Sequence, residues 1–204
     1  MQSIGQFRKP GLILVEGKDD DCIVQSLLQH LGLSDQIDTL QLGGKDDWPR
    51  KLRAVARLRG FGLVKSLLLV RDSDSNPGGA FQAIRGALTS AKLPVPDEPT
   101  EWAVSPKMRA AGHLLPSETA NGELEDLCLL SVSNEPAMHC VELMANCVAQ
   151  LADPPSKLAK FKVQAYLAAQ PGVFDTLAIG AKAGVFPPGH AAFSVLRALL
   201  TEMA

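Results

Sequence analysis

The chain has 204 residues, enough for one well-packed core, and its 46% hydrophobic and 21% charged residues are typical of a globular protein rather than a disordered one. Its formal net charge of −2 gives no overall attraction to nucleic acid, so a polyanion would have to be met by a local basic patch or through metal ions. No apolar run approaches the roughly 20 residues that span a bilayer, and residues 1–10 lack the apolar core of a signal peptide, so we expect a cytoplasmic protein without a membrane partner.

The first half of the chain alternates between predicted strands and predicted helices. Short apolar runs predict strands, and apolar residues every three or four positions predict helices. The expected strands cover about residues 12–15, 37–42 and 67–70, and the expected helices cover about 20–31, 48–59 and 80–91. This order predicts an α/β fold with a central, mainly parallel sheet flanked by crossover helices.

The second half is predicted to be mainly helical. A proline-rich, acidic loop at 93–100 is followed by two short expected strands, at 102–104 and about 112–115, which extend the sheet. Helices are then expected at about 123–132, 135–152, 156–169 and 190–203. We expect residues 1–118 to form the α/β core and residues 119–204 to form a helical extension that packs on it as one structural unit and contributes to the site.

The cysteines and histidines give little sign of a metal site of their own. The four cysteines lie in apolar, helix-like segments without a Cys-x-x-Cys pair, which favours reduced core residues over zinc ligands or disulfides: Cys22, Cys128, Cys140 and Cys147. The four histidines are scattered without His-x-x-x-His spacing. Only His113 lies in a segment that approaches the acidic edge of the predicted sheet.

Two of the expected strands end in carboxylates. The apolar run 12–15 is followed by Glu16, and the run 67–70 is followed, after Arg71, by Asp72 and Asp74. The carboxyl edge of an open α/β sheet is where ligands bind, so neighbouring strands would bring these acids together. In extended backbone, Asp72 and Asp74 face the same side. Clustered carboxylates favour a hard cation such as Mg²⁺ or Mn²⁺. The alternatives are a helix cap at Glu16 and a plain hydrophilic strand end.

Two further features near these strands are open to more than one interpretation. Arg71 either pairs with an acid or, by strand alternation, points away from the metal. The turn formed by Gly43, Gly44 and Lys45 either presents backbone N–H groups and a cation to a phosphate or simply joins a strand to a helix.

Four motifs occur in order along the chain: Leu-Val-Glu-Gly-Lys-Asp-Asp at 14–20, Gly-Gly-Lys-Asp at 43–46, Val-Arg-Asp-Ser-Asp at 70–74 and Gly-Glu-Leu-Glu-Asp-Leu at 122–127. Together they resemble the Toprim domain, and more closely a largely uncharacterised family of small free-standing OLD-like Toprim proteins. The resemblance covers most of the chain and includes the segment 160–167. It implies a Rossmann-like Toprim fold and phosphodiester chemistry.

The same resemblance assigns further expected roles. It makes Glu16 a metal ligand or general acid/base, and it aligns Asp20 with the last acid of a Glu-Gly-x-x-Asp pattern, although an acid in a first helical turn is also favoured by the helix dipole. Glu125 and Asp126 are the expected acids for a second metal ion, on a helix expected to bury its leucines at 124, 127 and 130.

The resemblance also implies a lysine that stabilises the charge developing on a phosphate. Lys160 and Lys162 are the candidates, and because residues two apart on a helix do not share a face, only one of them is expected to point inward. A solvated helix surface is the alternative.

Three functions are consistent with these patterns. The first is a Mg²⁺-dependent nuclease that hydrolyses DNA or RNA by a two-metal mechanism. The second is a non-catalytic or partner-dependent module acting with a separate ATPase, since the chain itself has no P-loop. The third is a nucleotidyl transferase, because the same metal arrangement serves synthesis and hydrolysis.

Overall fold

The computed structural model describes residues 6–44 and 47–204, and its centre is a five-stranded sheet with the strand order β2-β1-β3-β5-β4. Strands β1 (Gly11–Val15), β2 (Ile37–Gln41), β3 (Ser66–Asp72) and β5 (Arg109–Leu115) run parallel, and β4 (Ala103–Val104) pairs antiparallel with β5. The expected mainly parallel α/β fold is therefore confirmed, and β5 begins three residues earlier than predicted.

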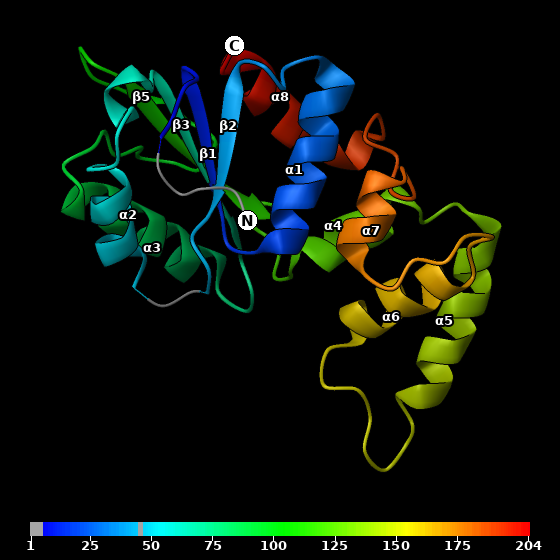
Figure 1. Cartoon of the computed structure of the whole chain (residues 1–204). Helices are drawn as coiled ribbons and strands as arrows, with labels where there is room; N and C mark the ends of the chain where they lie inside the picture. The colour runs from blue at the N-terminus through cyan, green and yellow to red at the C-terminus, as the bar shows by residue number, and fades with distance from the viewer. Residues whose placement is uncertain (1–5, 45–46) are drawn as a thin grey trace.

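The two central strands are continuous apolar runs because helices cover both faces of the sheet (Figure 1). Every residue of β1 is buried, as is every residue of β3 from Ser66 to Arg71. Their side chains alternate between two hydrophobic cores: Ile13 and Leu68 belong to one, and Leu14 and Leu69 belong to the other.

One face of the sheet carries α2 (Trp48–Val55) and α3 (Pro77–Ser90), which pack on each other. The other face carries α1 (Lys18–Leu31), with α7 (Leu177–Lys182) and α8 (Ser194–Glu202) against it (Figure 1). Short 3₁₀ turns at Phe61–Leu63 and Ala191–Phe193 precede β3 and α8. Helix α2 ends four residues earlier than predicted, in turns that lead to β3.

The remaining helices are α4 (Leu124–Ser131), α5 (Pro136–Val148) and α6 (Leu158–Ala168). Helix α6 packs on both α4 and α5, and the α5–α6 pair extends away from the sheet (Figure 1). The buried residues of α4, α6, α7 and α8 join the core that also contains the buried face of α1. None of the helices in the described ranges has the length and apolarity needed to cross a membrane.

The helical half departs from the sequence predictions, and helix α5 ends four residues earlier than expected. Helix α7 was not predicted, because it has only six residues and contains Gly180; a Cβ at that position would lie 2.5 Å from Leu167 Cδ2. Leu130 was expected to be buried but is 54% exposed. The prediction of core cysteines is wrong for Cys140 and Cys147, which lie on exposed positions of α5, whereas Cys22 and Cys128 are buried.

Candidate acidic site at the carboxyl edge of the sheet

Strands β1 and β3 form the switch point of the sheet. From β1 the chain crosses by α1 to β2 on one side, and from β2 it crosses by α2 to β3 on the other. Glu16 directly follows β1, and Asp72 is the last residue of β3. The two acids therefore lie at adjacent strand ends, where open α/β sheets bind their ligands.

Glu16 is held by a buried arginine. The Nε atom of Arg71 lies 3.3 Å from Glu16 Oε1, an ion pair between side chains that are only 10% and 11% exposed. The Arg71 guanidinium also lies 5.2 Å from the ring of Trp48, the first residue of α2 and itself 1% exposed. Of the two interpretations of Arg71, pairing with an acid is confirmed, and the aromatic face of Trp48 fixes the guanidinium in place.

Asp20 reaches the same region from the first turn of α1. Its Oδ2 accepts a hydrogen bond of 2.9 Å from the Gly17 N–H, whereas its buried Oδ1 has no hydrogen-bond partner among the described residues. Burial is the main cause that raises the pKa of Asp20 to about 6, and the charges of Glu125 and Asp19 add to it. Part of this carboxyl is thus dedicated to capping the helix, and the other oxygen is unsatisfied.

Asp72 is strongly disfavoured as an anion. Burial raises its pKa to about 8, with further contributions from the charges of Asp20, Glu16 and Glu125. One hydrogen bond opposes this shift, since the N–H of Leu124 donates to Asp72 Oδ1 over 2.9 Å and so joins the end of β3 to the start of α4. Four carboxylates from three separate segments therefore influence one another at this edge.

Glu125 and Lys160 bring the helical half of the chain to the acids. Glu125, 6% exposed, forms an ion pair with the Nζ of Lys160, which also lies 3.3 Å from Glu123 Oε2. Burial alone would lower the pKa of Lys160, but these two glutamates outweigh it and raise the pKa. Lys162 lies elsewhere and pairs with Glu142 of α5 at 2.8 Å. Only one of the two predicted lysines is thus next to the acidic cluster.

In this structure Asp126 caps the start of α4, and the backbone of Asp74 pairs with that of Gly122. The Oδ2 of Asp126 accepts from the Glu123 N–H at 2.9 Å, the reciprocal contact of a capping box at the start of α4. Asp74 exchanges two backbone hydrogen bonds with Gly122, of 2.8 and 2.7 Å. Because Asp74 has a left-handed φ of 51°, the extended backbone expected from Asp72 to Asp74 is wrong, and strand alternation does not place the two side chains on one side.

The glycine turn after β2 is tied to the site through its backbone. Gly43 and Gly44 both have positive φ, at 67° and 47°, and the Gly43 N–H donates to the Glu16 carbonyl at 2.8 Å. That N–H group is therefore not available to a phosphate, whereas the turn itself positions the backbone of Glu16. Lys45, the cation predicted here, lies outside the described residues.

His113 does not join the acids. It is 3% exposed on β5, and its Nδ1 lies 2.8 Å from Glu118 Oε1. This hydrogen bond is the main cause that lowers the pKa of Glu118. Strand β5 runs beside β3 as far as Leu115, which is paired with Asp72, but the His113 side chain bonds to the loop after β5.

Two neighbours of the acids were not among the predicted site residues. Trp48 makes a cation–π contact with Arg71, and Glu123 forms ion pairs with both Lys157 and Lys160. Burial alone would raise the pKa of Glu123, but the two lysines outweigh it and lower the pKa. Glu123 lies inside the motif at 122–127, so the sequence could have indicated it as a site residue. No local sequence pattern indicates the contact between Trp48 and Arg71.

The donor chemistry suits a hard cation, but the carboxylates are not drawn together into a ligand set. Within residues 6–44 and 47–204, no three His, Cys, Asp or Glu side chains are grouped closely enough to hold a metal ion. The oxygen donors, the unsatisfied Asp20 Oδ1 and the crowded charge at Asp72 nevertheless fit a divalent ion with oxygen ligands.

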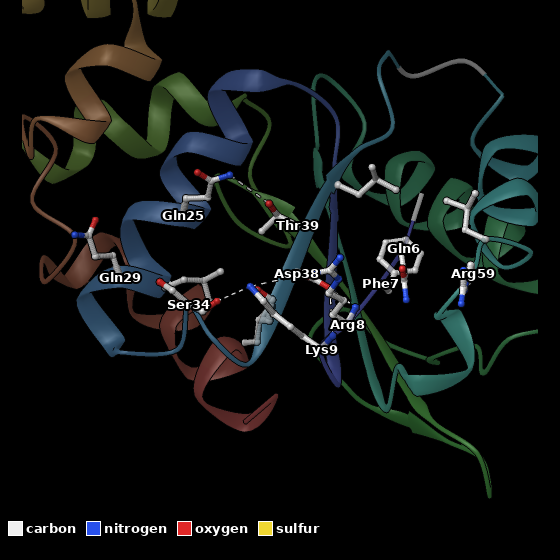
Figure 2. Close-up of a pocket in the computed structure, with 14 residues that line it drawn as sticks. Gln6, Phe7, Arg8, Lys9, Gln25, Gln29, Ser34, Asp38, Thr39 and Arg59 are labelled. Carbon is white, nitrogen blue, oxygen red and sulfur yellow. Dashed lines mark hydrogen bonds and ion pairs between the residues drawn. The ribbon is translucent and has the colours of Figure 1, made fainter. Parts of the chain in front are cut away.

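A separate hollow of about 910 Å³ lies along the outer edge of β2 (Figure 2). It is lined mainly by polar side chains from the N-terminal segment, α1 and β2, and none of the acids described above borders it. Arg59, which follows α2, and Arg8 also line this hollow. It is therefore not part of the acidic site.

The fold and this edge define a Rossmann-like α/β protein with buried carboxylates at the switch point of its sheet. Within that class, the chain belongs to the family described as "Protein of unknown function (DUF3226)", which it matches over residues 10–203. A comparison with curated proteins gives no match.

Several solved structures are similar to this chain. Hypothetical protein PH0156 from Pyrococcus horikoshii OT3 has a TM-score of 0.66 and 16% sequence identity, over 96% of this chain and 95% of that one, and it shares the fold. The C-terminal region of the Burkholderia pseudomallei OLD protein gives a TM-score of 0.49 at 14% identity, over 97% and 100% of the two chains. The corresponding region of the Xanthomonas campestris pv. campestris OLD protein gives 0.47 at 15% identity, over 96% of each.

Proposed function

We propose that this protein is a Toprim-type nuclease that hydrolyses nucleic-acid phosphodiester bonds with the help of Mg²⁺ or Mn²⁺. The order of its four motifs, from the Glu-Gly after the first strand to the Glu-Asp at 125–126, supports this assignment. The switch-point position of Glu16 and Asp72 supports it independently, because that edge is where ligands of open α/β sheets bind.

The observation that carries the proposal is the mutual influence of Asp72, Asp20, Glu16 and Glu125. Burial and the neighbouring charges raise the pKa of Asp72 to about 8, so the cluster is electrostatically unfavourable when all its members are ionised. A divalent cation held by these carboxylates would remove that penalty. Buried acids with shifted pKa values at a ligand-binding edge are typical of functional sites.

In this account Glu16, Asp20, Asp72 and Glu125 are the residues that would hold the cation or cations. When bound, the cation or cations would supply an activated water and would stabilise the leaving oxygen of the phosphodiester. Lys160 neutralises charge that develops on the phosphate, and its present partner Glu125 keeps its ammonium group at the cluster. Arg71 and the Gly43 N–H hold the side chain and the backbone of Glu16, respectively.

Cation binding is the first step to test. Titration of the purified protein with Mn²⁺, followed by electron paramagnetic resonance of the free ion, should show saturable binding that Mg²⁺ competes for. Asp72→Asn should weaken Mn²⁺ binding at least tenfold. Glu118→Gln, which alters a carboxyl paired with His113, should leave Mn²⁺ binding unchanged. Equal binding by all three proteins would exclude the cluster as the metal site. Metal binding without cleavage of any nucleic acid would favour the partner-dependent module.

A further inference from the structure

The segment from Trp48 to Val70 is strongly cationic. It contains six of the chain's 20 Lys and Arg residues and no Asp or Glu, although the whole chain carries a net charge of −2. The basic side chains in this segment are Arg50, Lys51, Arg53, Arg57, Arg59 and Lys65. This local excess of positive charge is not apparent from the net charge of the whole chain.

Three of these arginines lie on one side of α2. Arg50 and Arg53 are three residues apart on the helix, and Arg57 lies in the turn that continues it, where its N–H bonds to the Ala54 carbonyl at 3.0 Å. All three are exposed. In the described part of the chain, Arg57 makes no ion pair, and Arg50 pairs only with Asp47, the residue before the helix. We call Arg50, Arg53 and Arg57 the arginine stripe.

The arginine stripe starts beside the acidic site. Trp48, the first residue of α2, lies under Arg71, which is paired with Glu16. The loop that leads into α2 donates the Gly43 N–H to the Glu16 carbonyl. At its other end the stripe is followed by Arg59, which lines the hollow along β2 together with Arg8 (Figure 2). The basic residues therefore run from the start of α2, next to Trp48, to Arg59 at the hollow along β2.

The spacing of the stripe suits a phosphate backbone. Seven residues separate Arg50 from Arg57, which corresponds to about 10 Å along a helix at about 1.5 Å per residue. One strand of a nucleic acid presents a phosphate about every 3.4 Å of helix axis, so this length spans about three phosphates. Arginine is also suited to bind phosphate oxygens in a bidentate manner.

We propose that the arginine stripe binds the phosphate backbone of a nucleic acid and guides it to the carboxylates at the switch point. This inference rests on the proposed function, because it names the surface by which the substrate would be held. It also explains how a chain with a net negative charge engages a polyanion. The occupant is DNA or RNA, which share this backbone chemistry.

The test measures binding apart from cleavage. Fluorescence anisotropy with labelled single-stranded DNA, double-stranded DNA and a structured RNA, all in EDTA, gives Kd at several salt concentrations. The variant R50Q/R57Q removes two stripe charges and leaves Arg53, which bonds to Ser90 of α3. The control variant K107Q/K182Q removes two exposed charges from other surfaces. Thermal unfolding of both variants checks that they fold.

We expect R50Q/R57Q to weaken binding of at least one nucleic acid tenfold or more, with the control within about twofold of the wild type. The slope of log K against log[salt] should fall by about 1.4 to 1.8, since each phosphate contact contributes about 0.7 to 0.9. Equal weakening by the two double variants would overturn the proposal, as would displacement of the nucleic acid by poly-glutamate at equal charge concentration.

Absence of binding by the wild type at low salt would also overturn it. That outcome would not decide the proposed function, because hydrolysis of the small diester bis(p-nitrophenyl) phosphate with Mn²⁺ tests that function without requiring nucleic-acid binding. Conversely, Asp72→Asn should lose that hydrolysis and keep nucleic-acid binding. The two failures are therefore distinguishable.

Discussion

Arg71 and Glu16 form a buried ion pair across the switch point, with Nε and Oε1 3.3 Å apart and the guanidinium lying over Trp48. Both side chains are almost fully withdrawn from water, so each helps to compensate the charge of the other. The pair links the end of β1 to the last residues of β3 and to the start of α2. It therefore sets the position of the glutamate around which the proposed metal site is built.

Removal of Arg71 should destabilise the protein. Arg71→Met leaves the buried Glu16 carboxylate without this cation, and we expect a loss of about 3 kcal/mol in the free energy of unfolding, measured by urea denaturation. The double variant Arg71→Met/Glu16→Gln should recover at least half of that loss. Arg85→Met is the control, since Arg85 is paired at 3.6 Å with the 92% exposed Asp97 and should cost less than about 1 kcal/mol. Equal losses for Arg71→Met and Arg85→Met would contradict a buried pair.

The raised pKa of Asp72 should make stability depend on pH. Between pH 4 and pH 8 the folded protein retains a proton on Asp72 that the unfolded chain has released, because the pKa is about 8 when folded and 3.8 ordinarily. Stability in EDTA should therefore fall as pH rises through this range. Asp20, with a pKa of about 6, contributes in the same direction up to about pH 6.

Asp72→Asn tests this dependence because the asparagine cannot ionise and keeps an acceptor for the Leu124 N–H. The variant should match the wild type near pH 4 and exceed it at pH 8 by at least about 1 kcal/mol, or about 2 to 4 °C in Tm. Saturating Mg²⁺ should raise the Tm of the wild type more than that of the variant. A wild type whose stability relative to the variant is constant or rises with pH would show that Asp72 is not held as the neutral acid.

The two lysines of α6 should differ in activity. Lys160 contacts Glu125 and Glu123 beside the cluster, whereas Lys162 pairs with Glu142 on the α5–α6 pair. We expect Lys160→Gln to lower the cleavage rate at least 100-fold and Lys162→Gln to stay within about threefold of the wild type. Each variant loses ion pairing on the same helix, so their thermal unfolding is a matched control. Similar rate losses in both would remove Lys160 from the site.

Asp126 is expected to support the helix rather than the chemistry. Asp126→Ala removes the acceptor of the Glu123 N–H and should cost about 1 kcal/mol of stability, while cleavage stays within about threefold. Asp126→Asn should restore most of the stability, since an amide oxygen still accepts this bond. Glu125→Gln should show the opposite behaviour, with cleavage reduced at least 100-fold. A large rate loss in Asp126→Asn would return Asp126 to the metal-binding set.

The sheet and the switch point were predictable from the sequence because β1 and β3 are buried on both faces and read as continuous apolar runs. The acid at the end of each strand followed from the same pattern. Helix α7 was missed because six residues around a glycine carry too little periodicity, and its burial depends on contacts with α1 and α6. Such contacts are set by the tertiary fold.

Side-chain partners were the least predictable part of the site. The sequence offered Lys160 and Lys162 as equals, and only the packing of α6 on α4 and α5 separates them. The left-handed backbone at Asp74 depends on its bridge to Gly122, 48 positions away, which no local pattern indicates. The pairing of Arg71 with Glu16 likewise required the register of neighbouring strands.

Cleavage of nucleic acid in the presence of Mg²⁺, Mn²⁺ or EDTA by the wild type and by Asp72→Asn tests the central claim most directly. Supercoiled DNA, single-stranded DNA and a structured RNA cover the substrate classes. The account predicts cleavage of at least one of them by the wild type with Mg²⁺ or Mn²⁺, none with EDTA, and a rate at least 100-fold lower in a folded Asp72→Asn variant. Cleavage that persists in EDTA or in Asp72→Asn, or no cleavage in any reaction, would contradict it.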